Sequence, residues 1–125
     1  MPATLRTCSV AQVADHLPQL TPASLRTAID KYPDHVVLDV RTDAEWRAGH
    51  IEGALHVPVS DLIKGGVELD KERHVTTVCH SGYRSNIAGS FLKSQGYGHV
   101  FSLIGGMTAW KAAQRTAEAK KGESQ

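Results

Sequence analysis

The sequence predicts an α/β fold in which a central, mainly parallel sheet is covered by helices on both faces. Short apolar, β-branched runs alternate along the chain with helix-like segments, which is the pattern of strands joined by helical crossovers. The run Val36–Leu38 is apolar throughout, as expected of a strand that is buried on both faces. The 125 residues, 41% of them hydrophobic, are enough for one domain with its own core.

In the first half of the chain, the helix boundaries follow from capping residues. Thr21 is a good N-cap and Pro22 fits the first helical position, so a helix begins there. Thr42 or Asp43 caps a second, short helix, which Gly49 ends. The expected elements are an edge strand near Gln19–Thr21, a helix from Pro22 to about Lys31, a strand Val36–Leu38, a helix Ala44–Ala48, a strand Ala54–Val57 and a helical turn Ser60–Ile63.

In the second half, hydrophobic spacing gives the clearest helix of the chain. Over Ser85–Gln95, the side chains of Ile87, Ala88, Phe91 and Leu92 recur at helical spacing and should form one buried face. The expected elements here are a strand Val75–Cys79, this helix, a strand Val100–Ile104 and a last helix from Met107 to about Arg115. The large aromatic side chains should lie in the core: Trp46, Phe91 and Trp110.

The domain should be flanked by two short segments. Residues 1–19 form an N-terminal extension, in which Val10, Val13 and Leu17 recur at helical spacing. This spacing fits either a short amphipathic helix or a loosely packed arm. Residues 20–116 form the domain, and the polar residues 117–125 should form a flexible C-terminal tail.

Composition excludes several classes of protein. With 14 basic and 13 acidic residues, the net charge of +1 gives no basic face for nucleic acid. Two cysteines, Cys8 and Cys79, do not make a disulfide framework. The N-terminus lacks an apolar signal-peptide region, and no apolar run could span a membrane, so we expect a cytoplasmic protein without a membrane partner. No histidine pair has metal-site spacing, and we expect neither a metal nor another cofactor.

The segment from Cys79 to Arg84 carries the strongest chemical signal. A β-branched run stops at Cys79, a loop containing Gly82 closes on Arg84, and a helix follows from about Ser85. Backbone N–H groups and a helix N-terminus would therefore surround one sulfur atom, which favours the thiolate. Arg84 adds a full positive charge. The pattern predicts a reactive Cys79 assisted by Arg84.

The remaining residues of this loop should contact the bound anion or line its entrance. Gly82 permits the positive φ of a tight turn, Ser81 and Ser85 offer hydroxyl groups, and His80 and Tyr83 form the rim. Two chemistries use such a cradle, phosphoryl transfer through a cysteinyl phosphate and sulfur transfer through a cysteine persulfide. Four residues separate the cysteine from the arginine. Cysteine phosphatases have one more, so the tighter ring favours a single extra sulfur atom.

A second candidate region lies at the end of the strand Val36–Leu38. Asp39 and Arg41 follow this strand, and the carboxyl ends of parallel strands are where ligands bind. Arg41 could line the entrance to the cysteine loop and bind substrate, or it could form an ion pair that ties two loops together. For Asp39 we expect the structural role.

Three stretches together resemble the single-domain rhodanese (thiosulfate sulfurtransferase-like) family over roughly Leu20 to Gln114. They are Leu38–Ala54, which contains Asp39-Val40-Arg41 and Gly49-His50-Ile51, then the six-residue loop Cys79–Arg84, and Gly105-Gly106-Met107-Thr108-Ala109-Trp110. The resemblance implies a rhodanese-like three-layer α/β/α domain. It also implies a sulfurtransferase in which Cys79 attacks the sulfane sulfur of an anionic donor, such as thiosulfate or a glutathione persulfide.

The sulfur would then pass from a Cys79 persulfide to an acceptor thiol of a small molecule or a protein, or to cyanide. Rhodanese-like domains also serve as non-catalytic binding or regulatory modules, usually when the cysteine is absent, and that alternative stays open at this point. A cysteine-dependent phosphatase or arsenate reductase is a third alternative. It is disfavoured by the length of the loop and by Val78, because these phosphatases usually carry a histidine before the cysteine.

Overall fold

The structure is a computed structural model that describes residues 17–123. The N-terminal segment with Val10 and Val13, for which a short helix was one expectation, lies outside the described residues. Leu17, which the sequence placed in the extension, is buried in the core. The packed part of the chain therefore begins before the edge strand.

The centre of the molecule is a five-stranded sheet in the order β1-β5-β4-β2-β3, and all its pairings are parallel. This confirms the predicted parallel sheet, including its edge strand. β2 is buried at every position, in agreement with its apolar sequence. The strands are β1 Gln19–Leu20, β2 Val36–Asp39, β3 Leu55–His56, β4 His74–Val78 and β5 His99–Leu103.

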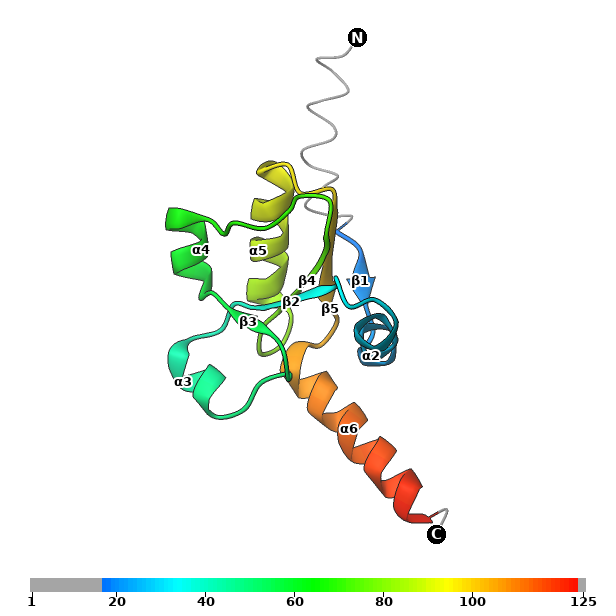
Figure 1. Cartoon of the computed structure of the whole chain (residues 1–125). Helices are drawn as coiled ribbons and strands as arrows, with labels where there is room; N and C mark the ends of the chain where they lie inside the picture. The colour runs from blue at the N-terminus through cyan, green and yellow to red at the C-terminus, as the bar shows by residue number, and fades with distance from the viewer. Residues whose placement is uncertain (1–16, 124–125) are drawn as a thin grey trace.

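Helices cover both faces of the sheet, which gives three layers (Figure 1). On one face, Leu62 of α4 and Leu92 of α5 pack in the core cluster that contains Val75 of β4. On the other, Leu25 of α2 and Trp110 of α6 share a second cluster. The helices are α2 Pro22–Lys31, α3 Asp43–Arg47, α4 Val59–Gly65, α5 Tyr83–Ser94 and α6 Gly106–Glu123.

The predicted apolar face of α5 is partly wrong. Ile87 is exposed, whereas the buried positions are Ser85, Ala88, Gly89 and Leu92, which recur at helical spacing. Gly89 belongs to this face because Leu17 packs directly on it. A Cβ at Gly89 would lie 2.6 Å from a methyl carbon of Leu17. Small side chains on the helix thus allow the segment before β1 to pack closely.

Helix α6 extends far beyond the end that the sequence suggested. We expected it to end near Arg115, but it continues to Glu123 and projects from the body of the domain (Figure 1). The residues after Arg115 are mainly alanine, glutamate and lysine, which are strong helix formers. The helix propensity of these residues therefore continues α6 through a segment that is polar.

Two general properties follow from residues 17–123. No helix in this range combines the length and the apolar character needed to cross a membrane. Within the same range, no three side chains of His, Cys, Asp or Glu are grouped closely enough to hold a metal ion.

Candidate active site

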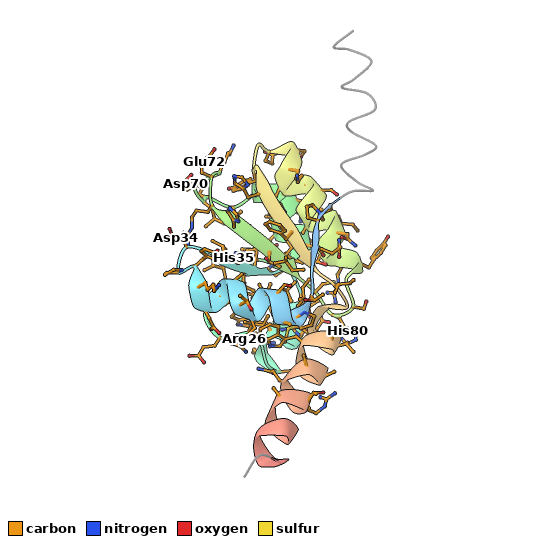
Figure 2. The ribbon with its side chains drawn as sticks, turned by 90° about the vertical axis from the view of Figure 1, so that its right-hand side faces the viewer. Arg26, Asp34, His35, Asp70, Glu72 and His80 are labelled. Atoms are coloured by element: carbon orange, nitrogen blue, oxygen red, sulfur yellow. The ribbon has the colours of Figure 1, made fainter. Side chains whose placement is uncertain are left out.

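The cysteine loop lies at the carboxyl end of the sheet, where parallel sheets usually place their ligands. β4 ends at Val78, so Cys79 is the first residue after this strand. Figure 2 shows His80 near the start of α6, at the opposite end of the molecule from Asp34, Asp70 and Glu72. The loop is therefore formed where β4, α5 and α6 meet.

The sulfur of Cys79 is buried and accepts a backbone hydrogen bond. Cys79 is 1% exposed, and the N–H of Gly82 donates to its Sγ at 3.0 Å. Gly82 has a φ of +112°, a conformation that a residue with a side chain rarely adopts. This turn folds the loop back over the sulfur, as the sequence predicted for Gly82.

Helix α5 begins directly after this turn, at Tyr83. The N–H groups of its first turn have no acceptor within the helix, and the helix dipole places partial positive charge at this end. Because the Gly82 N–H already contacts the sulfur, this positive end lies next to Cys79. The arrangement stabilises a negative charge on the sulfur or on an atom bound to it.

Ser85 does not line the loop, contrary to our expectation. It is completely buried; its Oγ donates to the carbonyl oxygen of Gly82 at 3.0 Å and lies 2.6 Å from Oγ of Ser102 on β5. Thr77 on β4 in turn donates to the Ser85 carbonyl oxygen at 2.8 Å. Ser85 therefore holds the Gly82 turn against the sheet and positions the loop, without reaching its surface.

Arg84 is paired with a residue that sequence reasoning missed. Its Nη1 and Nη2 donate to Oε1 and Oε2 of Glu45 on α3, at 2.8 and 2.9 Å. Through this hydrogen bond, the arginine lowers the pKa of Glu45 to about 2. The same bond is the main cause of the raised pKa of Arg84, to which the charge of Cys79 also contributes. Arg84 is thus held beside the loop with its charge largely offset.

The first turn of α6 supports the loop from behind. The N–H of Met107 donates to the carbonyl oxygen of Cys79 at 2.8 Å, and the N–H and Oγ of Thr108 donate to that of His80 at 3.2 and 3.1 Å. Gly106 has a φ of +57°, and a Cβ there would lie 2.6 Å from the His80 carbonyl oxygen. Gly106 is therefore required for this contact, because any side chain there would collide with the loop.

Arg41 does not line the entrance, so its predicted substrate-binding role is not supported. The Arg41 side chain is 4% exposed and forms a bidentate ion pair with Asp39, with Nη2 to Oδ2 at 2.8 Å. Nη2 also donates to the carbonyl oxygen of Gly49 at 2.7 Å. The pair ties the end of β2 to the loop after α3, which confirms the structural role expected for Asp39.

Trp46 also differs from its predicted place in the core. It is half-buried on α3, with its ring stacked between those of His50 and His56, at centroid distances of 3.4 and 4.7 Å. His56 bonds the Arg41 carbonyl oxygen at 2.9 Å. The stack therefore braces α3, the helix that carries Glu45, against the strand ends. Trp110, in contrast, is buried as predicted.

The side chains predicted to form the rim, His80 and Tyr83, are at the surface, and so is Ser81, which was predicted to hydrogen-bond the anion. His80 and Ser81 are exposed, and Tyr83 is 75% exposed. The structure thus brings together Cys79, Gly82 and Arg84, and it leaves Ser85 and Arg41 beneath the site as supports. Of the missed residues, Glu45 had a usable signal. Thr42-x-x-Glu45 is a capping-box sequence, and both of its bonds are present at the start of α3.

Comparison with known proteins agrees with this arrangement. The family described as Rhodanese-like domain matches residues 21–113. A Coxiella burnetii protein named thiosulfate sulfurtransferase GlpE is 37% identical over 91 residues, which are 73% of this chain and 85% of that protein. A sulfurtransferase of Allochromatium vinosum is 39% identical over 70% of this chain and 81% of its own length. The chain also matches YrkF of Bacillus subtilis at 31% identity, but spans only 52% of that protein.

Solved structures show the same fold. The rhodanese-like domain of the Anabaena protein Alr3790 has a TM-score of 0.70 and 33% identity, over 77% of this chain and 74% of that one. A rhodanese-related protein from Thermoplasma volcanium has a TM-score of 0.69 and 27% identity, over 77% of this chain and 92% of that one. With the family match over most of its length, this chain belongs to the rhodanese-like domain family.

Proposed function

We propose that this protein is a sulfurtransferase that carries a sulfane sulfur as a persulfide on Cys79. The observation that carries the proposal is the position of Sγ at the start of α5, where the Gly82 N–H already donates to it. The names of the two sulfurtransferase relatives support the same reaction class. Because the cysteine and its cradle are intact, a purely regulatory module is the weaker alternative.

In the first step, the Cys79 thiolate attacks the outer sulfur of the donor. With thiosulfate, a bond forms between Sγ and that sulfur while the sulfur–sulfur bond of the donor breaks, and sulfite leaves with the electron pair. The product is a Cys79 persulfide that carries the negative charge. The Gly82 N–H and the N-terminus of α5 stabilise this charge before and after the transfer, without having to reorganise.

In the second step, an acceptor takes the outer sulfur. The thiolate of a small molecule or of a protein attacks the terminal sulfur of the persulfide, and the Cys79 thiolate leaves and is regenerated. With cyanide the product is thiocyanate. The partners that we propose are therefore an anionic sulfur donor, either thiosulfate or a low-molecular-weight persulfide, and a thiol acceptor. The proposal needs no metal or cofactor.

Arg84 supports this reaction through the N–H donors that Glu45 leaves free. A guanidinium has five N–H donors, and Glu45 takes two of them, so the others can contact an anionic donor. The exposed His80, Ser81 and Tyr83 surround the entrance and would contact the rest of the donor. We assign Ser85 and Arg41 no direct contact with substrate.

The test is the mass of the intact protein after incubation with thiosulfate. We expect a gain of one sulfur atom, which cyanide then removes as thiocyanate. The Cys79→Ser variant should not gain the sulfur, and the matched Cys8→Ser variant should gain it like the unsubstituted protein. An unchanged mass in the unsubstituted protein, or an equal gain in Cys79→Ser, contradicts the proposal. Turnover of an aryl phosphate by the same sample would instead favour a phosphatase.

A further inference from the structure

The ion pair between Glu45 and Arg84 joins two segments that are far apart in sequence. Nη1 of Arg84 donates to Oε1 of Glu45 at 2.8 Å, and Nη2 donates to Oε2 at 2.9 Å. This bidentate geometry fixes the plane of the guanidinium as well as its position. The two side chains are 29% and 30% exposed, so the pair lies at the surface beside the loop.

Glu45 is itself held in place before it meets the arginine. Its Oε1 accepts hydrogen bonds from the N–H of Thr42 at 3.0 Å and from the Thr42 Oγ at 3.1 Å. The N–H of Glu45 donates back to the Thr42 Oγ at 3.3 Å, which completes the capping box of α3. The carboxylate is therefore a fixed negative charge, and it stays ionised at all pH values at which the protein would work.

We propose that Glu45 is a positioning residue that sets the charge preference of the sulfur donor. It orients Arg84 beside the loop and offsets its charge, and in this way it disfavours doubly charged donors relative to singly charged ones. This inference rests on the sulfurtransferase function proposed above. It deepens that function because it concerns which class of anionic donor the site accepts.

The physical reason is that the penalty grows with the charge of the donor. A fixed negative charge near the entrance opposes each negative charge that approaches, so a dianion experiences about twice the repulsion of a monoanion. The Gly82 N–H and the helix end act on the reacting sulfur, which is present in both kinds of donor. Only the additional negative charge of the dianion therefore distinguishes the two kinds of donor, and this charge interacts with the Glu45–Arg84 pair.

Two donors of different charge provide the test, thiosulfate as the dianion and methanethiosulfonate as the monoanion. Both deliver one sulfur atom to Cys79 and release sulfite or methanesulfinate. The readout is the ratio of their kcat/KM values at low ionic strength, where charge effects are least screened. The variant is Glu45→Gln, which removes the charge and should still fold, because glutamine also serves at this position of a capping box.

We expect the ratio of thiosulfate to methanethiosulfonate to rise about fivefold in Glu45→Gln, as the loss of one unit charge at moderate distance implies. Arg84→Met should shift the ratio in the opposite direction. Asp43→Asn is the matched control, because it removes one charge from the same helix at a residue with no contact to Arg84, and it should change the ratio much less.

The outcomes separate this inference from the proposed function. If Glu45 were only structural, Glu45→Gln would slow both donors equally and leave the ratio unchanged, which would overturn the inference alone. An equal shift in Asp43→Asn would overturn it too, because any surface charge would then suffice. If the unsubstituted protein transferred sulfur from neither donor, the proposed function itself would fail.

Discussion

Met107 donates its backbone N–H to the carbonyl oxygen of Cys79, at 2.8 Å. Cys79 is thus held by its own backbone from the start of α6, while its sulfur faces the start of α5. With the carbonyl oxygens of Cys79 and His80 bound on the α6 side, the loop can present N–H groups to the sulfur. The starts of α6 and α5 therefore lie on opposite sides of the loop, with its carbonyl oxygens bound to α6 and its N–H groups directed toward the sulfur.

Substitution of Gly106 should test this support. In Gly106→Ala, the added Cβ would collide with the carbonyl oxygens of Cys79 and His80, at a φ of +57° that already disfavours alanine. The loop must shift to relieve the clash, and we expect sulfur transfer to fall at least about tenfold, because small displacements of a nucleophile are costly. Steady-state assays with thiosulfate and cyanide measure the effect.

Gly53→Ala is the matched control for this variant. Gly53 also has a positive φ, of +84°, but a Cβ there would meet no atom within 4 Å. In Gly53→Ala, the only cost should be the unfavourable backbone conformation of alanine at this φ, about 1 kcal/mol of stability, and the activity should be kept. Equal activity losses in both variants would show that the contact between α6 and the loop is unimportant.

Ser85→Ala should destabilise the protein through the Gly82 turn. The change leaves the Gly82 carbonyl oxygen and the buried Oγ of Ser102 without the Ser85 hydroxyl, which should cost about 1–3 kcal/mol in the free energy of unfolding. Because the two serines are partners, Ser85→Ala combined with Ser102→Ala should cost less than the sum of the single changes. Urea denaturation measures both, and additive losses would argue against the coupling.

Loss of Arg41 should mainly lower the stability of the protein, because its side chain neutralises a buried carboxylate. Arg41→Met leaves the Asp39 carboxylate buried without its partner, at a cost of about 3–5 kcal/mol in the free energy of unfolding. Adding Asp39→Asn should recover part of this loss, since the uncompensated charge is then removed. Chemical denaturation of the unsubstituted protein and of these two variants checks the prediction. A loss below about 1 kcal/mol in Arg41→Met would contradict the buried ion pair.

The Glu45–Arg84 pair should give a characteristic acid dependence of stability. The pKa of Glu45 falls from its usual 4.5 to about 2 on folding, so between these values the unfolded chain binds more protons. The stability that the pair contributes is therefore complete above about pH 5 and is lost as the pH falls toward 2. Urea midpoints at about pH 5 and about pH 3 should differ less in Glu45→Gln than in the unsubstituted protein. In Glu52→Gln, which changes an exposed glutamate, the difference should persist.

The order of the elements and the position of Cys79 directly after a strand could be predicted from the sequence, because both depend on local patterns. Thr21 is the N-cap of α2 and Pro22 is its first residue, as expected from the preferences of these residue types. Cys79 follows β4 because a β-branched run ends there. The length of α6 was underestimated, since a polar segment of good helix formers carries no hydrophobic period by which to recognise it.

The sequence by itself determined a parallel α/β domain with a cysteine loop at the carboxyl end of one strand, closed by an arginine. Only the tertiary structure decided what the polar side chains around the loop contact. Arg84 meets Glu45 on α3, Ser85 meets Ser102 on β5, and Arg41 turns back to Asp39. A side chain at a strand or helix end can reach several neighbours, and the strand order selects among them. Local sequence patterns do not contain that order, so they could single out Arg84, Ser85 and Arg41 without giving the partners that these side chains contact.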